Sequence, residues 1–160
     1  YRVLDIDDCV PMAEQTAMSM GAIGAIGAKL ARPDKKVVCF AGDGAMQMSI
    51  VELATAAELR CGVTWIVLNN HAFGWVQYNQ LLANKPFIGT GFEVNSDFAA
   101  IAAAQSCLGL TVSDPGDIDG AVTEALAAND KGVPALIDVA IEPHHYHEHF
   151  EQIHRSRLEH

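Results

Sequence analysis

The sequence is poor in basic residues and contains no basic run. Ten Lys and Arg residues stand against twenty Asp and Glu residues in the 160-residue chain, giving a formal net charge of -10. Such an acidic balance argues against nucleic acid or an anionic membrane surface as the main partner. Long hydrophobic runs are missing too, because the most apolar early stretch, Met18–Ala28, contains several glycines and is shorter than the ~20 residues of a membrane span.

Paired cysteines are also absent. The four cysteines are widely spaced and form no C-x-x-C pair, which argues against a zinc ribbon or a disulfide framework. We therefore expect reduced, mostly buried thiols. Together with the lack of a secretory pattern, this predicts a cytoplasmic protein. The cysteines are Cys9, Cys39, Cys61 and Cys107.

What the chain does have is enough apolar sequence for one domain. Half of its residues are hydrophobic, in a mass of 17.1 kDa. We place this domain at residues 1–143. Residues 144–157 form a His-rich segment, for which a solvated tail is the first interpretation and adventitious binding of a transition metal the second. Residues 158–160 resemble the remnant of a vector-encoded tag.

Apolar, β-prone runs alternate with helical stretches from Lys36 to Ile141. This alternation predicts an α/β fold, a three-layer Rossmann-like domain whose mainly parallel sheet is flanked by helices. The runs 36–41 and 63–68 are almost continuously apolar, so we expect central strands buried on both sides. The predicted helices include residues 48–60, which would follow a glycine loop.

Residues 12–31 predict the first helix, which would end before Pro33. Gly21, Gly24 and Gly27 would place a smooth strip on one face of that helix. Because glycine is costly inside a helix, the strip indicates close approach of another backbone or a ligand. A loop or a bent helix is the alternative.

Polar motifs follow two of the predicted strands. Gly42-Asp43-Gly44 follows the first strand, and Asn69-Asn70 follows the second. In open parallel sheets, ligands bind beyond the carboxyl ends of the strands. Glycines and a following helix would suit a phosphate, while the Asp43 carboxylate and the Asn70 oxygen would suit Mg²⁺. No P-loop lysine is present, and a plain turn at Gly-Asp-Gly is the alternative.

These residues resemble the cofactor motif of enzymes dependent on thiamine diphosphate, in which Asn-Asn follows Gly-Asp-Gly at the interval seen between Asp43 and Asn70. The surrounding sequence, Met20-Gly21, then 26–34 and Gly42-Asp43-Gly44-Ala45, is similar to the diphosphate-binding domain of acetolactate synthase-like enzymes. The resemblance covers about Met12 to Ile141. It implies the thiamine diphosphate-binding fold, and only one of the three domains of full family members.

The resemblance also implies a set of site residues. Mg²⁺ would be held by the side chains of Asp43 and Asn70 and by the carbonyl of Ala72. The motif glycines and the residue after them would contact the diphosphate. Met20 would support the rest of the cofactor as a bulky apolar residue, and Met18 would contact it through its carbonyl. Plain helix-core packing is the alternative for both methionines. The implied cofactor-binding residues are Met18, Met20, Gly42, Asp43, Gly44, Ala45, Asn70 and Ala72.

Family enzymes also use a glutamate from a separate pyrimidine-binding domain. We interpret Glu14, Glu52 and Glu58 as exposed helix charges, so this glutamate has no counterpart here. The chain alone is therefore expected to be catalytically incomplete, with the missing domain on the same gene product or on a partner subunit. Because family active sites lie between chains, the resemblance also implies a homo-oligomer.

The resemblance implies a decarboxylase or carboligase that acts on pyruvate or a related 2-oxo acid. Asn79 stands where acetolactate synthases carry a tryptophan, and the chain is also similar to sulfoacetaldehyde acetyltransferase, which transfers an acetyl unit to phosphate. A non-catalytic Rossmann-like binding module and a generic nucleotide-binding domain stay open as alternatives. His71, Trp75 and Tyr78 are candidate substrate-pocket residues, with packing as the alternative.

Overall fold

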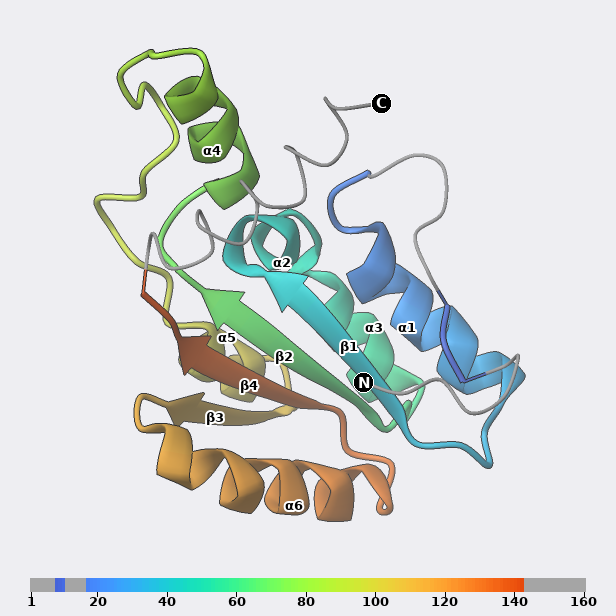
Figure 1. Ribbon diagram of the computed structural model, residues 1–160. Coiled ribbons are helices and arrows are strands. Elements are labelled where there is room, and N and C mark those ends of the chain that lie inside the picture. The colour runs from blue at the N-terminus through green and yellow to red at the C-terminus, as the bar shows by residue number, and fades with distance from the viewer. Residues whose placement is uncertain (1–7, 11–16, 143–160) are drawn as a thin grey trace.

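The computed structural model describes residues 8–10 and 17–142. Within these residues, parallel strands form one sheet in the order β1-β2-β4-β3 (Figure 1). The strands are β1 (Val37–Gly42), β2 (Val63–Asn69), β3 (Leu108–Val112) and β4 (Ala135–Ala140). The predicted domain boundary at 143, the His-rich segment 144–157, the tag remnant 158–160 and Glu14 all lie outside the described residues.

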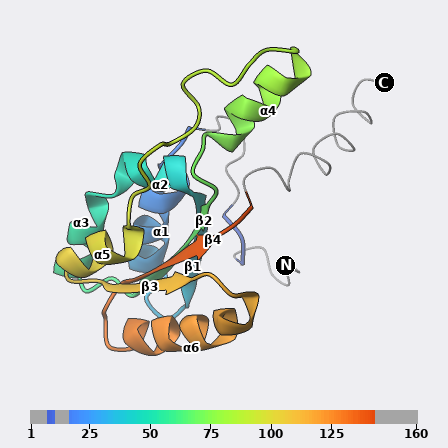
Figure 2. The ribbon, with the colours of Figure 1, turned by 90° about the vertical axis from the view of Figure 1, so that its left-hand side faces the viewer.

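Helices cover both faces of the sheet, as Figures 1 and 2 show. One face packs against α1 (Met20–Ala31), α2 (Asp43–Ser49), α3 (Glu52–Glu58) and α5 (Phe98–Ala104), and the other face packs against α6 (Ile118–Asn129). Each face of the sheet has its own hydrophobic core, and successive side chains of β2 point to opposite faces. Trp65 and Val67 belong to the core on the first face and Ile66 to the core on the second. The predicted three-layer α/β fold is confirmed.

Of the two runs predicted to form strands buried on both sides, β2 is buried on both sides and β1 is not. All residues of 63–67 are buried, whereas alternate side chains of β1 are exposed, with Val38 at 41% and Phe40 at 65%. The prediction was wrong for β1 because this strand lies at the sheet edge, while α6 packs against β2, β3 and β4. Continuous apolar sequence does not distinguish an edge strand from a central one.

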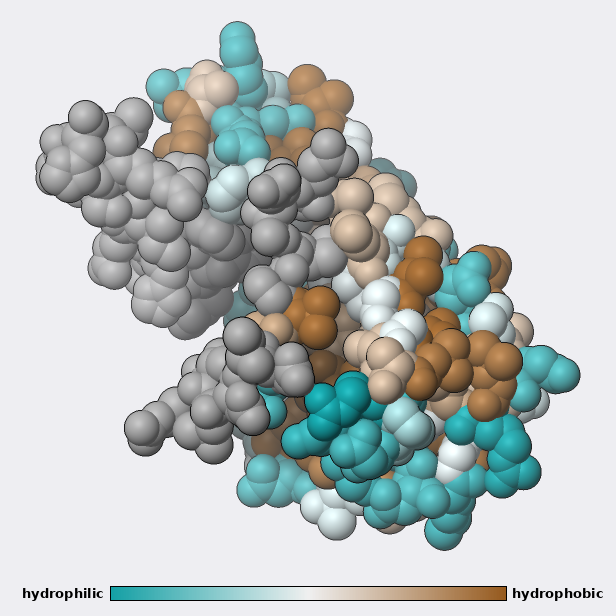
Figure 3. Space-filling model, turned by 90° about the vertical axis from the view of Figure 1, so that its right-hand side faces the viewer, coloured by the Kyte–Doolittle hydropathy of each residue, from teal (hydrophilic) through white to brown (hydrophobic). Residues whose placement is uncertain are grey.

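The first helix, α1, begins at Met20, because Ser19 has a left-handed backbone with φ 74°. Its inner face is buried, and the indole N–H of Trp65 donates to the carbonyl of Ala22 at 2.9 Å. Gly24 and Gly27 lie on the outer face, where a Cβ would meet nothing within 4 Å. The glycines therefore lie in a helix as predicted, but residues 17–19, which were predicted to be helical, precede it, and no described segment approaches Gly24 or Gly27. The face of the molecule that carries α1 shows much hydrophobic surface (Figure 3).

The predicted helix 48–60 is in fact two helices, and no glycine loop precedes them. Helix α2 begins directly at Asp43. The chain then tightens at residues 50–51, where Leu53 N–H donates to Ile50 O at 3.4 Å and Ala54 N–H donates to Val51 O at 3.3 Å. These i to i+3 bonds are typical of a 3₁₀ turn. This turn separates α2 from α3.

The structure also contains a helix that the sequence analysis did not predict, α4 (Gly74–Leu82). It projects beyond the carboxyl ends of the strands, together with the following segment 83–97 (Figures 1 and 2). A short 3₁₀ turn, η1 (Pro115–Asp117), precedes α6. Across the described part of the chain, every helix is too short or too polar to cross a membrane.

Candidate functional site

Asp43 lies where β1 ends and α2 begins, and its carboxylate joins two strand ends. The residue is only 2% exposed. Its Oδ1 accepts from the backbone N–H of Gly44 at 2.7 Å, and its Oδ2 accepts from the backbone N–H of Ala72 at 3.1 Å. Ala72 follows β2, which pairs with β1. The fold therefore brings two of the predicted metal-binding residues into direct contact.

The environment of Asp43 has opposing effects on its acidity. Burial raises the pKa of the Asp43 carboxyl above its ordinary value, and the backbone N–H groups of Gly44, Ala72 and His71, with the nearby His71 side chain, act in the opposite direction. Burial has the larger effect because it removes the carboxylate from water. A cation beside Asp43 would favour the charged form of this group.

The turn after β2 is held by the segment 90–92. Asn70 is 6% exposed, and His71 has a left-handed backbone with φ 57°. The carbonyl of His71 accepts from the N–H of Phe92 at 2.8 Å, and the N–H of Phe73 donates to the carbonyl of Thr90 at 2.9 Å. These bonds fix the turn on both sides of Ala72.

The predicted metal-binding groups form an all-oxygen set: a carboxylate at Asp43, an amide at Asn70 and a carbonyl at Ala72. The Ala72 carbonyl oxygen accepts from the N–H of Gly74 at 2.9 Å. A carbonyl oxygen has two lone pairs, so the second can bind a cation. Hard cations such as Mg²⁺ prefer oxygen ligands and usually bind only one or two carboxylates plus phosphate oxygens. Among the described residues, no group of three His, Cys, Asp or Glu side chains could hold a metal. The residues present therefore fit Mg²⁺ with a phosphate ligand better than zinc.

The start of α2 leaves little room for side chains. A Cβ at Gly44 would lie 2.6 Å from the ring of Phe73 and 3.2 Å from the methyl group of Met18. The N–H of Gly44 already donates to Asp43, so Ala45, which is half-buried, is left as a backbone donor for a phosphate. Gly42 is exposed, and a Cβ there would meet nothing within 4 Å.

The two methionines that precede or begin α1 are not packed in a core. Met18 is 40% exposed and Met20 is 56% exposed. The methyl group of Met18 lies near Gly44, as described above, so this side chain is beside the Gly-Asp-Gly motif. The exposure of both side chains is contrary to the helix-core alternative and leaves both available to a ligand.

The candidate substrate-pocket residues differ in their accessibility. His71 is exposed, Trp75 is 51% exposed, and Tyr78 is completely buried on α4. The rings of Trp75 and Tyr78 are 6.1 Å apart between centroids. Burial of Tyr78 favours the packing interpretation for that residue, whereas the side chains of His71 and Trp75 are exposed.

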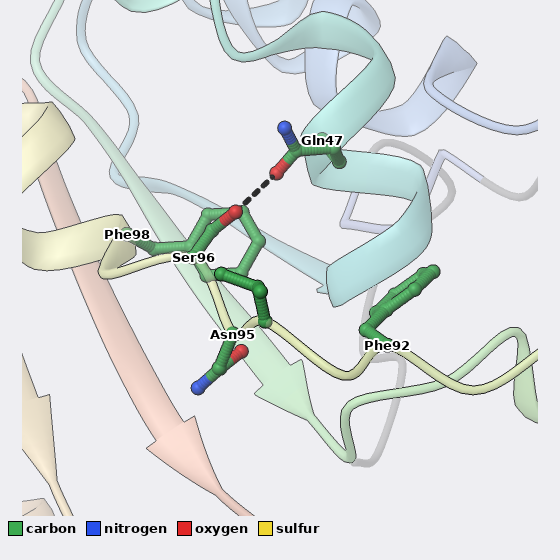
Figure 4. Close-up of a pocket in the computed structure, with 6 residues that line it drawn as sticks. Gln47, Phe92, Asn95, Ser96 and Phe98 are labelled. Atoms are coloured by element: carbon green, nitrogen blue, oxygen red, sulfur yellow. Dashed lines mark hydrogen bonds between the residues drawn. The ribbon is translucent and has the colours of Figure 1, made fainter.

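A small hollow lies on the same side of the sheet, between α2 and the segment 92–98 (Figure 4). Its volume is about 230 Å³, which is below the ~300–1,000 Å³ of an ordinary small-molecule pocket. The hydroxyl of Ser96 donates to Oε1 of Gln47 at 2.9 Å across it. The hollow is therefore too small for a whole nucleotide-sized cofactor. Its lining residues are Gln47, Phe92, Val94, Asn95, Ser96 and Phe98.

Sequence analysis missed two buried polar groups near this end of the sheet. Asp138 of β4 is 6% exposed and accepts from the side chain of Asn69 at 3.0 Å. Gln77 of α4 is 5% exposed, and its Oε1 has no hydrogen-bond partner in the described structure. The only available signal for Asp138 was one acidic residue inside an apolar strand.

Comparison with known proteins agrees with this geometry. The family model described as "Thiamine pyrophosphate enzyme, C-terminal TPP binding domain" matches residues 3–139. Thiamine pyrophosphate is another name for thiamine diphosphate. The chain is 35% identical over 130 residues to the acetolactate synthase large subunit of Haemophilus influenzae, covering 81% of this chain and 23% of that protein. It is 37% identical over 126 residues to the acetolactate synthase isozyme 1 large subunit of Escherichia coli, covering 78% of this chain and 22% of that protein.

A solved structure is similar as well. The thiamine diphosphate-dependent 4-hydroxybenzoylformate decarboxylase of Rhodococcus jostii RHA1 aligns with a TM-score of 0.71 and 31% identity, over 78% of this chain and 23% of that one. The chain thus spans less than a quarter of the length of these relatives. By its sequence and its fold, the chain belongs to the thiamine pyrophosphate enzymes, as a C-terminal thiamine pyrophosphate binding domain.

Proposed function

We propose that this chain is the thiamine diphosphate- and Mg²⁺-binding domain of a 2-oxo acid decarboxylase or carboligase similar to the acetolactate synthase large subunit. The observation that carries the proposal is the buried carboxylate of Asp43, which joins the ends of β1 and β2 beside the buried Asn70. A carboxylate, an amide and a carbonyl on two strand ends are suitable ligands for a cation bound to phosphate.

In this proposal Asp43, Asn70 and the carbonyl of Ala72 hold Mg²⁺, and the backbone around Gly44 contacts the diphosphate, with the N–H of Ala45 as the donor because that of Gly44 donates to Asp43. Thiamine diphosphate, when bound, supplies a nucleophilic carbon that adds to a carbonyl and a ring that accepts the electrons released by decarboxylation. Met20 supports the cofactor from one side, and Met18 contacts it through its carbonyl. Asp43 itself transfers no proton, because its role is to hold the cation.

The proposed domain, residues 1–143, needs a second domain for activity. Of the glutamates interpreted as exposed helix charges, Glu58 of α3 is exposed, whereas Glu52 at the start of α3 is half-buried. A pyrimidine-binding domain, on a longer gene product or a partner subunit, would supply the activating glutamate. A homo-oligomer that places the site between two chains is part of the proposal, and so is a cytoplasmic location, which the four free cysteines support.

The proposed substrate is pyruvate or a related 2-oxo acid, because the relatives are named as an acetolactate synthase large subunit and a 4-hydroxybenzoylformate decarboxylase. His71 and Trp75 are the described side chains best exposed to contact it. Acyl transfer of the sulfoacetaldehyde acetyltransferase kind would use the same cofactor site.

Calorimetric titration with thiamine diphosphate tests the proposal. Binding should require Mg²⁺, should disappear with a chelator, and should be tighter than binding of a dinucleotide. Asn70→Ala should weaken it by at least about tenfold, since loss of a metal-site group has effects of that size or more. Asn79→Ala, which removes an exposed amide from α4, serves as the control and should have little effect. Equal affinities for the two variants, or binding that ignores the metal, would disprove the proposed site.

A further inference from the structure

A buried hydrogen-bond network connects β4 with the turn that follows β2. The carboxylate of Asp138 lies inside the sheet layer, on the face that packs against α5, and is 6% exposed. Its Oδ1 accepts from Nδ2 of Asn69 at 3.0 Å. The backbone N–H of Phe98, at the start of α5, acts to lower the pKa of this carboxyl. Asp138 is therefore bonded to Asn69 and also faces the start of α5.

Asn69 is the centre of this network and uses both ends of its side-chain amide. Its Nδ2 donates to Asp138 and also to Oδ1 of Asn95 at 3.3 Å. Its Oδ1 accepts from the backbone N–H of His71 at 3.3 Å. Rotating this amide by half a turn would place Oδ1 against the carboxylate of Asp138, which is unfavourable because both groups are acceptors. Asp138 therefore determines which way the amide of Asn69 faces.

The direction of the Asn69 amide matters because of what its oxygen holds. His71 has φ 57°, a backbone conformation that non-glycine residues adopt only when the surroundings stabilise it. The carbonyl of Asn69 also accepts from the N–H of Ile141 at 3.0 Å, so the turn begins from a fixed point on the sheet. One residue further on, the N–H of Ala72 donates to Asp43. The network thus leads from Asp138 to the groups proposed to hold the metal.

We propose that Asp138 is a positioning residue: by orienting Asn69, it holds the turn 70–72 in the conformation in which Asn70 and the Ala72 carbonyl can bind a cation together with Asp43. This inference rests on the proposed function for the identity of the cation and its cofactor. Outer hydrogen-bond partners of metal ligands commonly act in this way, by fixing the ligands before the ion arrives.

The chain provides a matched control on the opposite face of the same sheet. There the hydroxyl of Thr64 donates to Oδ1 of Asn129 at 2.7 Å, and the amide of Asn129 donates to the carbonyls of Val63 and Val133. This second network is as buried as the first, but it lies against α6, far along the strand from the turn after β2. Removing it should destabilise the fold without moving the proposed metal ligands.

The test compares Asp138→Ala with Asn129→Ala by amide hydrogen exchange in the ligand-free chain and by calorimetric titration with thiamine diphosphate and Mg²⁺. Asp138→Ala should speed exchange at His71 and Ala72 by about tenfold and should weaken metal-dependent binding by about tenfold or more. Asn129→Ala should change both quantities by less than about twofold at a similar loss of unfolding free energy. Equal effects of the two variants would overturn the inference.

A pair of exchanged side chains keeps the test decisive if Asp138→Ala does not fold. Asn69→Asp alone places two carboxylates in contact and should release the turn. Asn69→Asp with Asp138→Asn restores one amide opposite one carboxylate, so exchange at His71 and cofactor affinity should return to near the original values. Failure of the double variant to improve on Asn69→Asp would contradict the inference. If the unaltered chain binds no cofactor, the proposed function fails, while exchange at His71 still decides the positioning role.

Discussion

At the scale of single residues, Asp43 has two properties that matter for its role. It is buried, which raises the pKa of its carboxyl, and it is bonded to backbone N–H groups, which keep the charged form accessible. A cation competes with a proton for this carboxylate. Because the pKa of Asp43 lies above that of an ordinary aspartate, protons begin to compete at a higher pH than usual.

The first prediction follows from that competition. Metal-dependent affinity for thiamine diphosphate should fall as the pH is lowered from neutral through the raised pKa of Asp43, because the protonated carboxyl no longer binds the cation. Calorimetric titrations at a series of pH values measure this directly. Affinity that stays constant or rises on acidification would show that the Asp43 carboxylate does not take part.

The second prediction concerns cysteine reactivity. Burial raises the pKa of the Cys39 and Cys107 thiols to about 11, so near pH 8 only about a thousandth of each is thiolate, the reactive form. Cys9 is exposed and should therefore react first with iodoacetamide in the folded chain. Mass spectrometry of the labelled peptides gives the order of modification. Labelling of Cys107 as fast as Cys9 would mean that the buried environment opens in solution.

Sequence alone predicted the contact between Asp43 and the turn after β2, because parallel strands carry their carboxyl ends to one edge of a sheet. It did not predict that Tyr78 is buried or that Asp138 bonds to Asn69. Both depend on how segments distant in the chain pack together, and β4 is far from β2 in sequence. The thiols were expected to be mostly buried, and Cys61 and Cys107 are buried and Cys39 half-buried, whereas Cys9 is exposed.

At the scale of helices and strands, the third prediction compares two glycines. A Cβ at Gly109 in β3 would overlap the carbonyl of Ala99 in α5, whereas a Cβ at Gly120 in α6 would meet nothing within 4 Å. Gly109→Ala should therefore lower the unfolding free energy by about 1–3 kcal/mol or more, because strand and helix must separate. Gly120→Ala should raise it by about 0.5–1 kcal/mol through higher helix propensity.

Urea denaturation of the two variants beside the parent chain provides the measurement. The two substitutions add the same methyl group, so opposite signs isolate the effect of the neighbouring backbone. Destabilisation of similar size at both positions would contradict the close contact between α5 and β3.

Element boundaries were predicted best where strong apolar patterns end. The strand β2, Val63–Asn69, lies close to the predicted range 63–68. The predicted helix 48–60 was wrong because Asp43 begins α2 earlier and a 3₁₀ turn at residues 50–51 divides the segment. Helix α4 was not predicted, and hydrogen bonds with the segment after it, those of Gln80 with Ile88 and Thr90, help to hold it in place.

At the scale of the whole molecule, the exposed apolar surface predicts self-association of the chain. On α1, Ile23 is 45% exposed and Leu30 is 56% exposed, and both lie on the outer face with Gly24 and Gly27. Apolar surfaces of this kind usually contact another protein surface. The relatives are more than four times as long as the matched segment.

The fourth prediction tests this surface. Light scattering should show that the average mass rises with concentration, and Ile23→Glu with Leu30→Glu should reduce that rise, because burying a charge in an interface is unfavourable. Val94→Glu is the control, since Val94 is 86% exposed and lies on the segment after α4. A parent chain that stays monomeric at high concentration would contradict the prediction.

Alternation of strands and helices was sufficient to predict the three-layer architecture, since few other folds bury such a pattern. It could not reveal that β1 lies at an edge, because strand order depends on packing between distant segments. Nor could it show that a small hollow lies between α2 and the segment 92–98, because its lining residues come from segments distant in sequence.

The central claim is that Asp43 makes cofactor binding depend on a metal, and one calorimetric experiment addresses it most directly. Thiamine diphosphate is titrated into the parent chain, Asp43→Ala and Asp114→Ala, each with Mg²⁺ and with chelator. Asp114 is an exposed aspartate whose Oδ1 also accepts from a backbone N–H, that of Gly116 at 2.8 Å, so it is a matched control. The account predicts Mg²⁺-dependent binding for the parent and Asp114→Ala and its loss in Asp43→Ala. Undiminished binding by Asp43→Ala would contradict the account.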